Sequence, residues 1–168
     1  MDLLVIRHAI AEDRQTFART GKSDELRPLT REGRLRMQRA AAGLRAVVPH
    51  IDLLATSPLV RAAQTAIIVA EVYGDVQPIE LDELRPEGDS QSLERWLNSQ
   101  EPDSTVALVG HEPSLSFHVS WLTAQSDDAF VEFKKGGTCL LRFYEGVFSG
   151  GAILRWMMTP KQLRSLGG

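Results

Sequence analysis

Apolar residues recur in two different patterns along the chain. Three short runs are almost entirely apolar, at residues 3–6, 53–56 and 106–109. Continuous runs, as opposed to alternating ones, are typical of parallel strands that are covered on both faces. Between the runs, apolar residues recur at helical spacing, which is the order of elements in βαβ units. The pattern therefore predicts an α/β fold in which helices cover a central sheet.

Helical spacing is clearest after Thr30, which is in position to cap a helix whose apolar face runs from Met37 to Val48. Ser57 is expected to cap the next helix, with Pro58 in its first position, because the proline ring fixes φ and that amide would be unpaired anyway. Helical spacing recurs at residues 59–73, 90–98, 115–122 and in the tail from residue 159.

Three other stretches complete the expected architecture. A strand is predicted over residues 76–81, and residues 138–144 and 152–156 are predicted to pair as an antiparallel hairpin. Residues 11–26 are polar and lack a period, so we expect a surface loop that borders the first strand end. The expected fold is a three-layer α/β/α sandwich with a mostly parallel central sheet and an antiparallel C-terminal hairpin.

Length and composition are consistent with a single core. The chain has 168 residues, of which 43% are hydrophobic, and no change in composition divides it. We therefore predict one domain over residues 1–168. The single cysteine, Cys139, cannot form an internal disulfide, and its place in a predicted strand indicates a small core residue.

Charge and hydropathy limit the expected partners. The formal net charge is -3 and no basic stripe emerges, so we expect no nucleic-acid partner. The sequence also lacks an apolar stretch long enough for a membrane span and the pattern of a signal peptide, which predicts a cytoplasmic protein with no membrane partner. Four arginines on the first predicted helix are interpreted as a solvated face: Arg31, Arg34, Arg36 and Arg39.

Side chains that can do chemistry follow the predicted strands. Arg7 and His8 follow the first apolar run, Arg61 falls in the first helical turn after the second, and His111 follows the third. Ligands of open α/β sheets bind outside the carboxyl ends of the strands, so these four residues are expected to converge at one edge. In a mildly acidic protein, such a cluster indicates a small, local anion site.

Two arginines and two histidines fit phosphoryl transfer. Guanidinium groups match the equatorial oxygens of a phosphoryl group, so Arg7 and Arg61 would clamp it. The neutral imidazole of His8 would attack phosphorus and form a covalent intermediate. His111 would donate a hydrogen bond or a positive charge to the phosphoryl group.

The four histidines could also bind a metal or have only structural roles. A zinc site built from His8 and His111 would face repulsion from two adjacent arginines and lacks an evident third ligand, so we expect no metal and no cofactor. His50 and His118 do not follow a strand, which assigns them ordinary surface or partly buried roles.

Four short motifs occur in a characteristic order: Arg7-His8-Ala9, Leu29-Thr30-x-x-Gly33, Ser57-Pro58-x-x-Arg61-x-x-Gln64-Thr65 and Gly110-His111-x-Pro113. Together they resemble the histidine phosphatase superfamily, in which an Arg-His-Gly signature carries the phosphorylated histidine; here Ala9 replaces the glycine. The short length, the Leu84-x-Pro86-x-Gly88-Asp89 segment and the closing Met158-Thr159-Pro160 with Leu163 are most similar to the SixA group of phosphohistidine phosphatases. The resemblance implies a phosphoglycerate mutase-like fold.

The resemblance also implies a proton donor for the leaving group. Phosphoglycerate mutases and many acid or sugar phosphatases of the superfamily carry a glutamate or aspartate in this role, and Glu83 is the nearest match, with Asp82 and Glu87 as competitors. An alkoxide is a poor leaving group without an acid, whereas phosphohistidine expels an imidazole whose conjugate acid has a pKa of about 6.5. A pocket without a strong acid would therefore favour a P–N bond.

We therefore predict a metal-independent phosphatase that forms a phosphohistidine intermediate and acts on phosphohistidine in a phosphocarrier or signalling protein. The alternative among enzymes is a phosphomonoesterase that acts on a small phosphorylated metabolite. The alternative of a different class is a non-catalytic module that binds a phosphoprotein.

Overall fold

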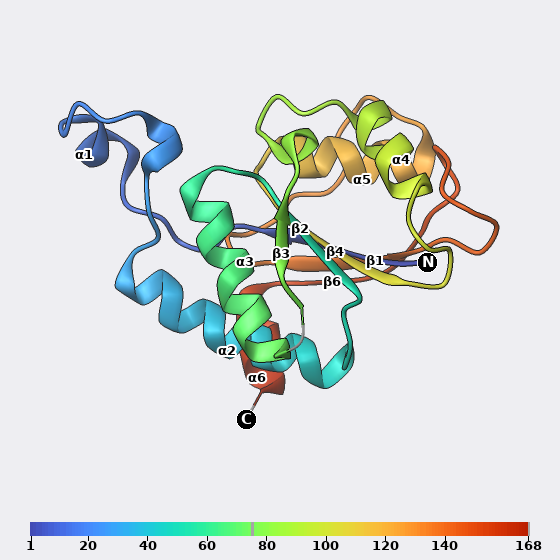
Figure 1. Cartoon of the computed structure of the whole chain (residues 1–168), viewed down its shortest axis with the longest axis horizontal. Coiled ribbons are helices and arrows are strands. Elements are labelled where there is room, and N and C mark those ends of the chain that lie inside the picture. The colour runs from blue at the N-terminus through green and yellow to red at the C-terminus, as the bar shows by residue number, and fades with distance from the viewer. Residues whose placement is uncertain (75, 168) are drawn as a thin grey trace.

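The computed structural model describes residues 1–74 and 76–167, and all its strands belong to one sheet (Figure 1). The strands are β1 (Asp2–Arg7), β2 (Leu53–Thr56), β3 (Pro78–Glu80), β4 (Thr105–Gly110), β5 (Thr138–Arg142) and β6 (Ile153–Met158). Their order across the sheet is β3-β2-β4-β1-β5-β6. The first four strands in this order run parallel, and β5 and β6 add the predicted antiparallel hairpin beside β1. The centre of the sheet is therefore the pair β1 and β4.

Helices cover both faces of the sheet (Figure 1). The longer ones are α2 (Arg31–Val47), α3 (Val60–Tyr73), α4 (Ser90–Asn98) and α5 (Ser114–Ala124), and α6 (Pro160–Leu166) ends the fold. Helices α2, α3 and α6 contribute to one hydrophobic core, and α4 and α5 contribute to another. This arrangement confirms the expected three-layer α/β/α sandwich with a mostly parallel sheet.

Strand β1 shows why the parallel strands read as continuous apolar runs. Leu4 and Ile6 belong to the core beneath α2 and α3, whereas Leu3 and Val5 belong to the core beneath α4 and α5. Successive side chains of a strand point to opposite faces, so a strand covered on both sides must be apolar at every position. All four side chains are at most 1% exposed.

The start of α2 follows its sequence signals. The Thr30 side chain accepts a hydrogen bond from the Gly33 amide at 2.9 Å, so the predicted N-cap is confirmed. A Cβ atom at Gly33 would lie 2.1 Å from the Ile10 carbonyl oxygen. Only glycine therefore allows this helix to pack directly against the chain that leaves β1.

Two local predictions were wrong. Helix α3 begins at Val60 after Leu59, and the Ser57 hydroxyl is instead engaged by a histidine of the site described below. Residues 11–26 are not only a loop, because they contain α1 (Arg14–Ala18) and the short 3-10 helix η1 (Asp24–Leu26). The Asp13 carboxylate caps α1 by accepting from the Thr16 amide at 2.9 Å. A one-turn helix is too short to produce a recognisable period.

The remaining boundaries differ from the predictions by a few residues. Strand β3 is confined to residues 78–80, and the hairpin strands span 138–142 and 153–158. Cys139 is fully buried in β5, as predicted. Within the described parts of the chain, no helix has the length and apolar character needed to cross a membrane.

Candidate active site

A cavity of about 470 Å³ opens at the carboxyl ends of β1 and β4. It brings together the four residues that the sequence analysis selected, Arg7, His8, Arg61 and His111. The predicted convergence is therefore confirmed, although the roles of these residues remain predictions. The rest of the lining comes from Ala11, Glu12, Asp13, Arg14, Arg27, Pro86, Glu112 and Lys135.

His8 is held by backbone contacts on both sides. Its amide donates to the Gly110 carbonyl of β4 at 3.0 Å, and the Ala9 amide donates to Thr65 Oγ1 at 3.0 Å. The Nδ1 atom of His8 lies 2.7 Å from the Ala9 carbonyl oxygen. A carbonyl oxygen only accepts, so Nδ1 carries the proton and the lone pair of the neutral ring resides on Nε2.

The second histidine lies close to the first. The ring centroids of His8 and His111 are 5.1 Å apart, and Nε2 of His111 lies 2.8 Å from Ser57 Oγ. Burial, with additional repulsion from His111, lowers the pKa of His8 to about 2. Burial and the nearby Arg61 lower the pKa of His111 to about 3. Both rings are therefore neutral near pH 7.

The side chains of Arg7 and Arg61 are each held by a hydrogen bond to a backbone carbonyl and, within the described residues, still have an N–H group without a partner. An Nη1 atom of Arg61 donates to the Asp24 carbonyl at 3.0 Å, and the side chain is 3% exposed. Arg7 donates to the carbonyl oxygen of Phe133. The Nε atom of each arginine is buried without a hydrogen-bond partner. Burial lowers the pKa of both guanidinium groups, yet arginine stays charged in proteins, so these donors are available to an anion.

A third arginine of the cavity, Arg27, was not predicted from the sequence. Arg27 is 7% exposed, donates from Nε to Asp24 Oδ1 at 2.7 Å and from Nη1 to the Glu12 carbonyl at 2.8 Å. Asp24 also lies 3.3 Å from Arg61, and hydrogen bonding by Arg27 lowers the pKa of this carboxyl group. The sequence did offer one signal for Arg27, which lies two residues before the Leu29-Thr30-x-x-Gly33 motif and directly after the polar segment 11–26.

The predicted proton donor lies outside the cavity lining. Glu83 belongs to the short 3-10 helix η2 (Asp82–Leu84), and neither it nor the competitors Asp82 and Glu87 lines the cavity, although Pro86 of the same segment does. The structure therefore does not bring Glu83 together with the other four residues. A Cβ atom at Gly88 would lie 1.9 Å from the Glu83 carbonyl oxygen, which shows how tightly this segment folds on itself.

A different glutamate does line the cavity. The Glu112 carboxylate accepts from the Phe133 amide at 2.7 Å and from Ser116 Oγ at 2.7 Å. The carbonyl oxygen of the same Phe133 accepts from Arg7. Glu112 and Arg7 are thus linked through one residue, and no sequence pattern could show this link because Phe133 is more than a hundred residues from Arg7.

The other histidines stay apart from the cavity. His50 is exposed and pairs with Asp52 at 2.8 Å, in line with a surface role. His118 is only 1% exposed and its Nδ1 lies 2.7 Å from Ser90 Oγ, so it is more deeply buried than predicted. Burial lowers the pKa of His118 to about 4. Across residues 1–74 and 76–167, no three His, Cys, Asp or Glu side chains gather closely enough to hold a metal ion.

Comparisons with known proteins agree with the motifs. Residues 3–94 match the family model of the histidine phosphatase superfamily (branch 1). An uncharacterised protein of Picosynechococcus sp. is 35% identical over 144 residues, which cover 84% of this chain and 85% of that relative.

Solved structures extend the similarity to the whole fold. The protein histidine phosphatase SixA in complex with tungstate superimposes with a TM-score of 0.82, at 25% identity, over 97% of this chain and 99% of that one. A mycobacterial glucosyl-3-phosphoglycerate phosphatase superimposes with a TM-score of 0.68, at 18% identity, over 92% of this chain and 96% of that one. At that lower identity, the likeness establishes the fold alone.

Proposed function

The chain belongs to the histidine phosphatase superfamily, and we propose that it hydrolyses phosphohistidine in a protein through a phosphorylated His8. The observation that carries this proposal is the state of the His8 ring. Its Nδ1 proton is committed to the Ala9 carbonyl, and among the described residues no hydrogen bond engages Nε2. A neutral imidazole with a free lone pair at the wall of a cationic cavity is a nucleophile for phosphorus.

In the first step, Nε2 of His8 attacks phosphorus and the P–N bond of the substrate breaks. The electron pair of that bond goes to the departing imidazole, which takes up a proton. Arg7 and Arg61 bind the equatorial oxygens, and Arg27 adds a third positive charge at the same cavity. Because Arg27 and Arg61 are buried and all three guanidinium groups are already held by hydrogen bonds, they stabilise the transition state with little reorganisation.

In the second step, water attacks the phosphorus of phosphorylated His8. The P–Nε2 bond breaks, inorganic phosphate leaves, and the neutral ring of His8 is restored. We propose that the Ser57 hydroxyl donates to Nε2 of His111, so that the neutral ring carries its proton on Nδ1 and donates it to the phosphoryl group. We propose that both steps proceed without a metal ion, since the guanidinium groups supply the positive charge.

The leaving group favours phosphohistidine over a phosphate ester. An alkoxide requires a positioned acid, whereas an imidazole is readily protonated near pH 7. Glu83 is outside the cavity lining, and the Glu112 carboxylate is occupied by an amide and a hydroxyl donor. The likeness to the SixA structure supports the same substrate class.

One observation favours a second candidate, hydrolysis of a small phosphate ester. Glu112 lines the cavity beside His111, and a carboxyl group there would be the nearest acid for an alkoxide. The fold is also that of a glucosyl-3-phosphoglycerate phosphatase. This candidate requires Glu112 to give up a hydrogen bond that it now accepts.

A comparison of substrates tests the proposal. The value of kcat/KM for a phosphohistidine peptide should exceed the values for serine phosphate and sugar phosphates by about a hundredfold. The reason is that only the alkoxide leaving group of the esters needs a general acid to protonate it. Phosphate release is measured for each substrate at equal concentration. Faster hydrolysis of the alkyl phosphates would contradict the proposal and favour the metabolite phosphatase.

A further inference from the structure

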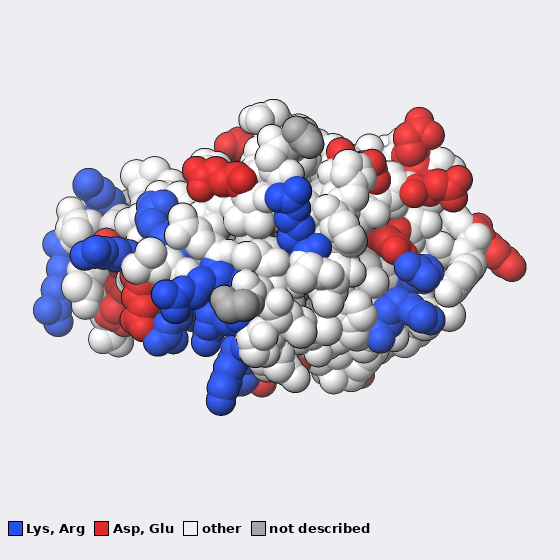
Figure 2. Space-filling view, turned by 90° about the horizontal axis from the view of Figure 1, so that it is seen from below, with Lys and Arg blue, Asp and Glu red and all other residues white. Residues whose placement is uncertain are grey.

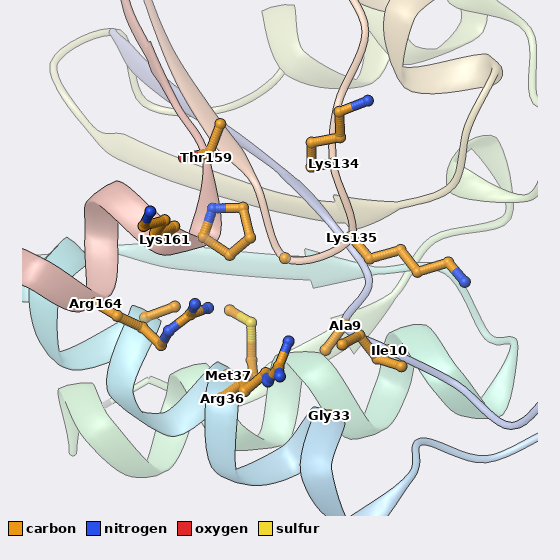
Figure 3. Close-up of a pocket in the computed structure, with 13 residues that line it drawn as sticks. Ala9, Ile10, Gly33, Arg36, Met37, Lys134, Lys135, Thr159, Lys161 and Arg164 are labelled. Atoms are coloured by element: carbon orange, nitrogen blue, oxygen red, sulfur yellow. The ribbon is translucent and has the colours of Figure 1, made fainter.

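Figure 3 shows the lining of a second hollow, of about 310 Å³, which shares Lys135 with the active-site cavity. Its apolar lining includes Ile10 and Pro160, which are half-buried, above the buried side chains of Ala9, Met37 and Ala40. Five cationic side chains surround it, namely Arg36 from α2, Lys134 and Lys135 from the segment before β5, and Lys161 and Arg164 from α6. Among the described residues, no aspartate or glutamate lines it. We call this hollow the basic groove.

Much of the positive charge of the basic groove is not neutralised. Within the part of the chain that the structure describes, no acidic side chain lies within ion-pair distance of Lys135 or Lys161. Lys134 pairs with Glu132 at 3.1 Å, but both side chains are more than 60% exposed, so this pair is weak. Arg36 was predicted to lie on a solvated face. Its side chain is exposed and pairs with Glu32, and it also borders the basic groove.

The charge is unevenly distributed for a protein whose formal net charge is -3. In Figure 2, lysine and arginine side chains predominate on one half of the visible face, and acidic side chains predominate toward the other end. A local excess of positive charge on an acidic protein raises the concentration of anionic partners near that surface.

The basic groove and the active site adjoin each other at Lys135. Lys135 lines both hollows, and Ala9, which borders the groove, directly follows His8. In Figure 3, Arg36, Met37 and Arg164 point from α2 and α6 into one space, while Lys135 extends on the side of Ala9 and Ile10. A chain that lies in the groove therefore passes within one residue of His8 along the cavity wall.

We propose that the basic groove binds an acidic segment of the phosphorylated protein and thereby places its phosphohistidine at His8. This inference rests on the proposed function. The carboxylates of the segment meet the cations at the rim, and the aliphatic parts of its side chains cover the apolar surface at Ile10 and Pro160. The groove thus selects among phosphoproteins, whereas the active site acts on the phosphoryl group.

The character of the cations favours a protein segment over a small anion. A small phosphate is bound by buried, fixed donors such as Arg61 and Arg27 in the active site. In the groove, Lys134, Lys135 and Lys161 are exposed and come from two separate segments. Charges of this kind guide association and select partners of opposite charge over a wide surface.

Two synthetic peptides of equal length test this proposal. Each carries one phosphohistidine, flanked by glutamate residues in one peptide and by glutamine residues in the other. The wild-type protein should hydrolyse the glutamate peptide with kcat/KM about tenfold higher, mainly through KM, because several exposed ion pairs of modest strength add up. Phosphoramidate serves as the control substrate: it has a P–N bond but is too small to contact the groove while its phosphorus is at His8.

A double variant with reversed charge, Lys134→Glu with Lys161→Glu, should abolish the preference for the glutamate peptide. Turnover of phosphoramidate should stay within about twofold of wild type, because neither lysine lines the active site. Glutamate at position 161 lies in the first turn of α6, where negative charge is favourable, so the fold should persist. Arg95→Glu with Arg155→Glu makes the same total charge change away from the groove and should keep the preference.

The outcomes separate this inference from the proposed function. If the wild-type protein hydrolyses both peptides equally well, the groove does not bind an acidic segment, and the proposed function stands. If it hydrolyses phosphoramidate and neither peptide, the proposed protein substrate is wrong. A third outcome is a double variant that keeps its preference for the glutamate peptide and loses activity toward a small substrate with two phosphate groups. In that case the groove binds the second phosphate of such a substrate, and the inference of an acidic protein segment is wrong.

Discussion

The active site and the basic groove are both rich in cations, but they hold them in opposite ways. In the active site, Arg27 and Arg61 are at most 7% exposed and are fixed by Asp24 and by backbone carbonyl groups. In the basic groove, the Lys134 side chain is 63% exposed, and Lys135 and Lys161 extend into solvent. Buried, oriented charge stabilises a transition state, and exposed, mobile charge guides encounter. The difference predicts that the active site controls kcat and the groove controls KM.

The largest expected effect comes from removing a buried charge. Arg61→Ala should lower kcat by about a hundredfold or more, because it removes a charge-assisted contact to the transition state from a buried guanidinium group. Arg7→Ala should act similarly. Steady-state kinetics on phosphoramidate and on a phosphohistidine peptide should show the same loss, because both substrates present the same phosphoryl group.

Arg95→Ala is the matched control for this experiment. Arg95 is an exposed arginine of α4 and does not line either hollow. Its replacement should leave kcat unchanged. If Arg61→Ala altered only KM, the division of labour between the two cationic regions would be wrong.

Ionic strength should affect the two regions differently. Raising salt from about 50 mM to about 300 mM should lower kcat/KM for a glutamate-flanked phosphohistidine peptide several-fold, because exposed charges are screened. The kcat value should change by less than about twofold, since buried charges are screened much less. An equal fall of kcat on phosphoramidate would show that the active-site charges are as accessible to salt as those of the groove.

The pH dependence of stability provides a smaller effect. Burial holds the pKa of His8 at about 2, of His111 at about 3 and of His118 at about 4. The ordinary value is about 6.5, so the unfolded chain binds protons that the folded chain does not, and stability is lost as pH falls below about 6.5. Between about pH 7.5 and pH 5.5, each buried histidine should cost roughly 1 kcal/mol of unfolding free energy.

Urea unfolding at these two pH values measures this loss. His118→Asn removes one of the three histidines without touching the active site, so its stability should fall less over the same interval. An identical pH dependence in that variant would mean that His118 is protonated in the folded protein.

The smallest expected effect concerns Glu83. If the site is adapted to phosphohistidine, Glu83→Gln should lower hydrolysis of the phosphohistidine peptide by less than about tenfold, because an imidazole leaving group needs no strong acid. Glu112→Gln, which changes a residue of the cavity lining, provides the comparison. A large loss for Glu83→Gln, together with efficient hydrolysis of alkyl phosphates by the wild-type protein, would indicate a metabolite phosphatase.

The sequence predicts most of the layer architecture because its signals are local. The apolar run at Leu3–Ile6 must be a strand covered on both faces, and Thr30 with Gly33 marks a helix start. The positions of Arg7, His8 and His111 follow from the rule that parallel strands end at one edge. These inferences need only neighbours in the sequence and one topological rule.

What the sequence could not show depends on contacts between distant segments. The place of Arg27 at the cavity depends on its hydrogen bond to the Glu12 carbonyl, 15 residues away, and the link between Glu112 and Arg7 passes through Phe133. Ser57 resembles a helix cap, but the approach of His111 from β4 engages its hydroxyl group instead. The basic groove likewise combines α2, α6 and the segment before β5, which lie far apart in the chain.

The most direct test of the central claim is to trap the phosphorylated protein. The wild-type protein, mixed with ³²P-labelled phosphoramidate and quenched in alkali, should carry label that is stable in base, labile in acid and confined by peptide mapping to His8. His8→Asn should carry none, while His111→Asn should still accumulate it. Label on His111, or on a carboxylate in the wild-type protein, would contradict the mechanism proposed for this site.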